Sequence, residues 1–230
     1  MKKIIHALLI IDKSTSMASY RSRTVEGINA NMSALKAEVD ENTEILVTQL
    51  QFSKTSNHSW GLAPAPESGT DFVFTQVGKN VTELVDLTEK EYNPGGWTPL
   101  LDAIGYGIEK VKAFHGDKLG DENLKIIVTI FTDGEENSST KWGRDEIKKM
   151  IQHFQADNKW TFTFIGCGDI DSVTATSATY GVLASNTVAI ADNDAGRLGA
   201  TTKISTSYTN YARATKSGVV DNTLFTAKSG

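Results

Sequence analysis

The sequence predicts a single doubly wound α/β domain, with a mainly parallel central sheet and helices on both faces. Strand-like and helix-like patterns alternate along the whole chain, which is the order that produces such folds. Segment 4–11 is almost continuously apolar and segment 123–132 is rich in apolar residues, as parallel strands buried on both faces are. The 230 residues, 39% of them hydrophobic, suffice for one sizeable core.

The first third of the chain alternates between apolar runs and helical periodicity. Apolar residues from Val25 to Val39 recur at steps of three and four, which predicts a helix from about Ser19. A surface excursion is expected at Lys54–Thr70 because prolines, glycines and small polar residues gather there. The remaining expected elements are strands at 4–11, 44–52 and 72–77, with a further short edge strand at 58–62 inside the excursion.

The rest of the chain is predicted to continue the alternation. Thr98 is placed as the N-cap of a helix whose first residue is Pro99 and which fades near 114–116. The later elements are a strand at 123–132, a helix carrying Ile147 and Ile151, a strand at 160–167, a short helix at 171–180, a strand at 187–190 and a closing helix from 194 to about 213. The domain is therefore expected at 1–213, and residues 214–230 form a tail that could dock as a strand or be mobile, the latter being favoured.

Oxygen-bearing side chains follow two of the clearest predicted strands. Asp12, Ser14 and Ser16 come directly after the first of these strands, and Asp133 comes directly after the second. In open parallel sheets, ligands bind at the carboxyl ends of the strands, where Thr98 is also expected. Oxygen ligands suit hard cations such as Mg²⁺. Five such oxygens, only two of them charged, would leave a divalent cation open to one more carboxylate from outside.

Each motif also has an ordinary structural explanation when it is taken alone. Asp12 and Ser14 could cap the following helix, Thr98 is a good N-cap in any fold, and Asp133 with Gly134 makes a common turn. Finding all three at strand ends favours a cation site.

The three motifs together resemble the von Willebrand factor A (VWA) domain family and its metal-ion-dependent adhesion site. The matching segments are IIDKSTSM, PGGWTPLLDAI and VTIFTDGEEN, in the family's order, and the resemblance spans about residues 4–213. It implies a Rossmann-like VWA fold in which Ser14, Ser16 and Thr98 contact the metal, while Asp12 and Asp133 bind it directly or through water. Thr15 departs from the family, which often has glycine there.

The resemblance implies a non-catalytic module that binds a protein through Mg²⁺, with Mn²⁺ or Ca²⁺ as other candidates. A partner's Asp or Glu would complete the coordination, and the residues flanking the metal would select the partner: Trp97, Glu135, Glu136 and Asn137. Packing of Trp97 beneath its own loop is an equally good explanation for that residue. Family members in an intracellular setting often act as adaptors of AAA+ ATPases, and such a role is one expectation here.

Two alternatives remain open. A Mg²⁺-dependent phosphotransferase could use Asp12 as a nucleophile, since a carboxylate after the first strand can form an aspartyl phosphate. A metal could also be purely structural in an assembly protein. The GxGxxG pattern of dinucleotide-binding folds does not follow the first strand, and the GxxxxGK[ST] pattern of P-loop proteins is absent.

Charge and composition narrow the class of protein. A net charge of −5 without a Lys/Arg-rich run argues against binding of nucleic acid. No apolar run approaches the roughly 20 residues needed to span a membrane. The single cysteine, Cys167, excludes a disulfide framework, and the N-terminal apolar run lacks a signal-peptide cleavage site. A cytoplasmic protein of bacterial or viral origin is therefore expected, and the oligomeric state is left open.

Overall fold

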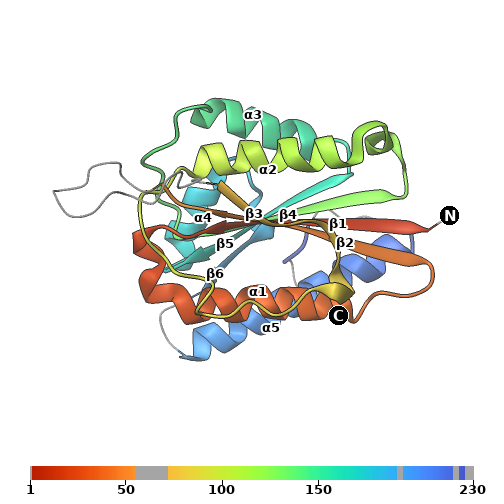
Figure 1. Ribbon diagram of the computed structural model, residues 1–230, viewed down its shortest axis with the longest axis horizontal. Coiled ribbons are helices and arrows are strands. Elements are labelled where there is room, and N and C mark those ends of the chain that lie inside the picture. The colour runs from red at the N-terminus through yellow and green to blue at the C-terminus, as the bar shows by residue number, and fades with distance from the viewer. Residues whose placement is uncertain (1, 55–71, 191–193, 220–222, 226–230) are drawn as a thin grey trace.

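A six-stranded sheet lies between two layers of helices in the computed structural model, which describes residues 2–54, 72–190, 194–219 and 223–225 (Figure 1). The sheet order is β3-β2-β1-β4-β5-β6, and only β3 runs antiparallel to its neighbour. The predicted α/β class with a mainly parallel sheet is confirmed. The strands are β1 (Lys3–Asp12), β2 (Thr43–Phe52), β3 (Phe72–Asn80), β4 (Leu124–Thr132), β5 (Trp160–Cys167) and β6 (Thr187–Ile190).

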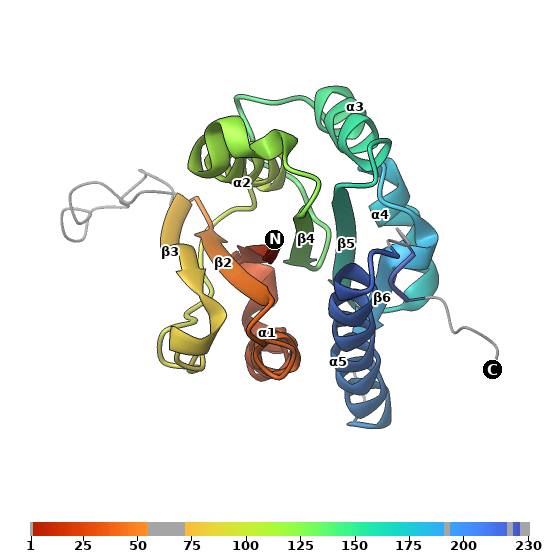
Figure 2. The same ribbon diagram turned by 90° about the vertical axis from the view of Figure 1, so that its right-hand side faces the viewer.

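The helices cover both faces of the sheet, as expected (Figure 2). One face carries α1 (Arg21–Lys36) and α5 (Asp194–Lys216). The other carries α2 (Leu100–His115), α3 (Arg144–Gln155) and α4 (Ile170–Thr179). Short 3₁₀ turns complete the described chain at Thr15–Tyr20, Val81–Glu83, Gly116–Gly120 and Ala184–Asn186.

The central strand β1 is apolar along its length because it supplies both cores. Side chains alternate between the two faces of a strand. Ile5, Leu9 and Ile11 therefore pack toward α1 and α5, whereas Leu8 and Ile10 pack toward α2 and α3. The residues between 5 and 12 are fully shielded from solvent, so β1 provides a rigid base for the loop that follows it.

The start of α2 differs from the prediction. Pro99 occupies the N-cap position without a side-chain cap, and the helix begins at Leu100, so the assignment of Thr98 as N-cap is wrong. The carboxylate of Glu136 instead accepts a hydrogen bond from the Leu101 N–H at 2.9 Å, and the Ser139 hydroxyl oxygen accepts one from the Asp102 N–H at 3.1 Å. Two of the N–H groups of the first turn are thus bound by the loop after β4.

The C-terminal end of the described chain is packed more extensively than the sequence predicts. Helix α5 continues three residues beyond Arg213, the expected end of the domain. Leu224 and Phe225 are buried in the core beneath α5, and the Phe225 N–H donates to the Ser185 carbonyl at 2.9 Å. These two residues of the expected tail are therefore in contact with the domain. The expected edge strand at 58–62 lies outside the described residues.

Among the described residues, no helix combines the length and the apolar character needed to cross a bilayer.

Two buried histidines connect the C-terminal end of α2 to β1. His6 Nδ1 lies 2.7 Å from His115 Nε2, and His6 Nε2 lies 2.8 Å from the Thr48 hydroxyl. Burial, with a smaller contribution from His115, lowers the pKa of His6 to about 3. Burial, followed by the charge of Lys118, also lowers the pKa of His115. The folded protein therefore favours the neutral form of both imidazoles.

We expect this histidine pair to make the protein less stable in acid. An unfolded histidine titrates near pH 6.5. As the pH falls from about 6.5 toward 3, the unfolded chain therefore binds a proton at His6 that the folded chain does not bind. Between pH 7.5 and 5.5 this costs roughly 1.4 kcal/mol of unfolding free energy for His6, and the lowered pKa of His115 acts in the same direction. Urea denaturation at the two pH values measures the loss.

His6→Gln should lose less stability than the wild type over the same interval, whatever its stability at pH 7.5. Gln152→Ala, a change at an exposed position on α3 that removes no titratable group, should keep the wild-type pH dependence. An equal loss in the wild type and in His6→Gln would contradict the assignment.

Candidate metal centre

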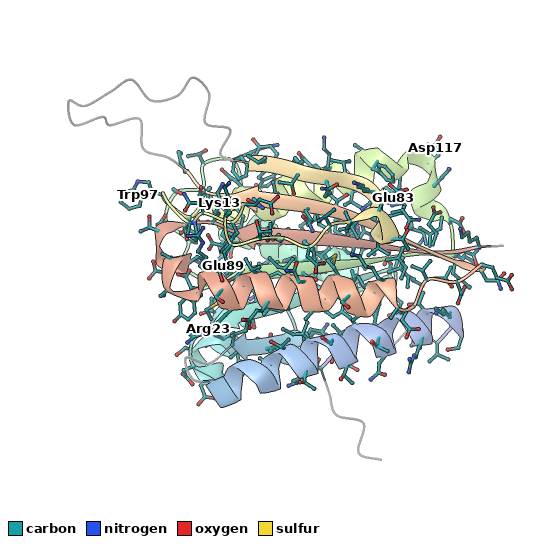
Figure 3. The ribbon with its side chains drawn as sticks, turned by 60° about the horizontal axis from the view of Figure 1, so that its bottom comes forward. Lys13, Arg23, Glu83, Glu89, Trp97 and Asp117 are labelled. Carbon is teal, nitrogen blue, oxygen red and sulfur yellow. The ribbon has the colours of Figure 1, made fainter. Side chains whose placement is uncertain are left out.

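The register of the parallel strands brings the predicted site residues to one edge of the sheet. Ile11 pairs with Phe131, so Asp12 ends β1 beside Thr132, which ends β4 directly before Asp133. Figure 3 shows Lys13 and Trp97 at this same end of the molecule, whereas Glu83 and Asp117 lie at the opposite end. The loops after β1, before α2 and after β4 therefore meet at one edge.

Backbone hydrogen bonds join the first two of these loops. The Thr15 N–H donates to the Gly96 carbonyl at 3.0 Å, and the Gly95 N–H donates to the Lys13 carbonyl at 2.8 Å. The Thr15 hydroxyl adds a bond in each direction with Gly96. Thr15, at a position where VWA domains often have glycine, thus joins the two loops.

The third loop is joined to both of the others. The Thr98 N–H donates to the Asn137 side-chain oxygen at 2.8 Å, and the Asn137 N–H donates to the Thr98 carbonyl at 3.2 Å. The Thr132 hydroxyl donates to the Asp12 carboxylate at 2.6 Å. The three loops consequently form a closed, hydrogen-bonded ring.

Asp12 is a buried carboxylate without a basic partner among the described residues. Its Oδ1 accepts the Ser14 N–H at 2.7 Å, and its Oδ2 accepts the Thr132 hydroxyl. Burial raises the pKa of Asp12 to about 7; these hydrogen bonds act in the opposite direction, and the charge of Asp133 adds to the rise. A bound cation would supply the missing countercharge, because an unpaired buried carboxylate is costly.

The hydroxyls of Ser14 and Ser16 form the second part of the candidate site. Their oxygen atoms lie 3.1 Å apart, close enough to contact one ion, with Ser14 buried and Ser16 exposed. Thr98 is buried, and Asp133 is half-buried at the start of its loop. Within the described part of the chain, no three or more His, Cys, Asp or Glu side chains gather as a metal-binding group. A cation at this edge would therefore depend on neutral hydroxyl oxygens, and the donor set fits a hard divalent ion.

The residues predicted to face a partner differ in their surroundings. Trp97 is 54% exposed, and its backbone exchanges two hydrogen bonds with Lys54, so the indole stands at the surface on a fixed backbone. Glu135 is exposed. Glu136 is half-buried, and its carboxylate accepts hydrogen bonds from the Leu101 N–H and from Ser138 and Ser139. The Asn137 side chain holds Thr98.

The sequence interpretation missed three contributors to this edge. Thr132 bridges Asp12 and the Gly134 N–H, and its place in the Thr-Asp-Gly segment could have identified it. Tyr92 and Tyr180 donate hydrogen bonds to backbone carbonyls of the site, and no local pattern marks either of them.

Known structures share this fold. No protein-family model matches the chain, and no curated protein matches it in sequence. The pilus adhesin SpaC of Lactobacillus rhamnosus GG, in its open conformation, is similar with a TM-score of 0.60 and 12% identity, covering 93% of this chain and 30% of SpaC. Proximal thread matrix protein 1 from the mussel byssus, in crystal form 2, has a TM-score of 0.51 and 14% identity, covering 93% of this chain and 48% of that protein.

The chain thus spans less than half the length of both SpaC and the byssus protein. At these identities the similarity concerns the fold. The manganese-loaded TRAP protein of Plasmodium vivax is 19% identical over 86% of this chain and 72% of TRAP, with a TM-score of 0.49.

We expect Glu136→Ala to destabilise the protein by about 2 kcal/mol, because it removes the acceptor for several backbone N–H groups, including one in the first turn of α2. Glu135→Ala, which truncates the exposed neighbouring glutamate, should change stability by less than about 0.5 kcal/mol. Chemical denaturation of the two variants measures both values. A Glu136→Ala protein as stable as Glu135→Ala would show that the carboxylate does not hold the start of α2.

Proposed function

We propose that this chain is a VWA-like module that binds a protein partner through a divalent cation at the edge formed by β1 and β4. Ser14, Ser16 and Thr98 would contact the cation, and Asp12 and Asp133 would bind it directly or through water. Mg²⁺ is the favoured ion, with Mn²⁺ and Ca²⁺ as alternatives. The role is binding, without catalysis.

The observation that carries this proposal is the closed ring of three loops around a buried, unpaired carboxylate. The ring links the three loops before any ion arrives, through hydrogen bonds that join Thr15 to Gly96, Thr98 to Asn137, and the Thr132 side chain to the Asp12 side chain. Preorganised backbones reduce the entropy lost on binding. Five protein oxygens would leave one position of an octahedral ion open, and an acidic residue from a partner would fill that position.

The surroundings of the edge support a protein as the partner. A half-exposed indole on a fixed backbone is the kind of side chain that anchors interfaces. The similarity to a pilus adhesin agrees with a binding module. An adaptor of an AAA+ ATPase, acting inside a cell, is the class of role that the family resemblance favours within this proposal.

The phosphotransferase alternative is less well supported by the geometry. An aspartyl nucleophile must reach a phosphorus atom. Asp12 is 0% exposed, and both of its carboxylate oxygens already accept hydrogen bonds. A purely structural cation is the other alternative, and it differs from the proposal in leaving partner binding insensitive to chelators.

We expect the wild type to bind one Mn²⁺ at up to millimolar concentration, as measured by electron paramagnetic resonance (EPR). Asp12→Ala and the double variant Ser14→Ala/Ser16→Ala should lose most of this affinity, because they remove proposed ligands. Ser22→Ala, a matched change at an exposed position on α1, should bind like the wild type. A wild type that binds no divalent cation would refute the adhesion-site proposal.

A second expectation concerns Trp97 and the partner. Once a partner has been captured with Mg²⁺ present, Trp97→Ala should weaken its binding by more than about 1 kcal/mol, since truncation of an anchor has this effect. The affinity for Mn²⁺ should stay the same, because the indole is not a metal ligand. Capture that survives EDTA would favour a structural cation, and capture unaffected by Trp97→Ala would remove the indole from the interface.

A further inference from the structure

Two buried tyrosines reach the candidate metal centre from opposite faces of the sheet. The Tyr92 hydroxyl donates a hydrogen bond to the Asp12 main-chain carbonyl, and the Tyr180 hydroxyl donates one to the Gly134 carbonyl at 3.2 Å. Both side chains are fully shielded from solvent. Tyr92 belongs to the core beneath α1 and α5, whereas Tyr180 belongs to the core beneath α2, α3 and α4.

Each hydroxyl binds a main-chain carbonyl close to the point where a strand ends and a loop with proposed metal ligands begins. The register of β1 with β4 ends at Ile11 and Phe131, one residue before Asp12. Gly134 follows Asp133 and adopts a positive φ of 90°, a conformation that glycine tolerates and most other residues avoid. Its N–H donates to the Thr132 hydroxyl at 2.9 Å, and Tyr180 holds its carbonyl. The peptide groups next to both carboxylates are thus fixed by side chains.

The tyrosines are themselves held firmly. The Tyr180 ring stacks on Phe164 with a centroid distance of 6.1 Å, and the Arg144 guanidinium lies over the ring at 4.9 Å. The Tyr92 N–H donates to the Thr88 carbonyl at 3.0 Å. Burial raises the pKa of both hydroxyls, so each stays protonated and remains a donor.

We propose that Tyr92 and Tyr180 are positioning residues of the metal centre: they set the main-chain geometry of the two carboxylate loops and thereby the affinity for the cation. This inference rests on the proposed function, since it presupposes a cation at this edge. Neither tyrosine would contact the ion. Groups that orient metal ligands typically contribute roughly 10-fold to 100-fold in affinity, and we expect the lower figure because these bonds act through the backbone.

The test compares three Tyr→Phe variants, each of which removes one buried hydroxyl and keeps the ring. Tyr92→Phe and Tyr180→Phe remove the proposed contacts. Tyr208→Phe is the matched control, because the Tyr208 hydroxyl is equally buried and bonds Thr129 and Thr163 inside the sheet. Thr129 precedes Thr132 by three residues, roughly 10 Å along β4. Mn²⁺ affinity by EPR and the thermal midpoint without metal are measured for all three.

We expect Tyr92→Phe and Tyr180→Phe each to weaken Mn²⁺ binding about tenfold, and to change the EPR spectrum of the bound ion. Tyr208→Phe should bind Mn²⁺ like the wild type, even if its thermal midpoint falls as far as theirs. Unchanged affinity in both site variants, or an equal loss in Tyr208→Phe, would overturn the inference while leaving the proposed function standing. Should one site variant fail to fold, the other decides. A wild type that binds no Mn²⁺ would overturn both proposals.

Discussion

The parallel pairing of β1 with β4 is the constraint on which the candidate site depends. It places Asp12 beside Thr132, and the Thr132 hydroxyl then joins the Asp12 carboxylate to the N–H of Gly134. Because β1 is buried on both faces, its carboxylate is buried as well, and burial raises its pKa to about 7. The fold thus places a carboxylate where only hydrogen bonds, a proton or a cation can stabilise it.

The loops around this carboxylate support one another. The loop before α2 holds the loop after β1 through Gly95 and Gly96, and the loop after β4 both caps α2 through Glu136 and holds Thr98 through Asn137. A change in the conformation of any one loop would therefore alter the hydrogen bonds that hold the other two. Glu136, one of the residues predicted from the sequence to face a partner, therefore also holds the start of α2.

The sequence was most informative where a pattern is local. The apolar runs of β1 and β4, together with the motifs that follow them, sufficed to predict the sheet class and the edge at which Asp12 and Asp133 meet. Contacts between distant segments could not be predicted in this way. The N–H groups at the start of α2 are bound by Glu136, 35 residues beyond Leu101, so Thr98 was assigned a capping role that it does not have. The contacts of Tyr92 and Tyr180 cannot be predicted from the sequence, because a buried tyrosine looks the same in sequence whether or not its hydroxyl binds a functional loop.

The central claim is that this edge binds a divalent cation through hydroxyl oxygens and two carboxylates. The most direct measurement is a crystal structure of the protein grown with Mn²⁺, with the ion located by its anomalous scattering. The account predicts one strong peak within about 2.6 Å of the hydroxyl oxygens of Ser14, Ser16 and Thr98. No peak at this edge, or a peak only at another group such as the carboxylates of Glu38 and Asp40, would contradict it.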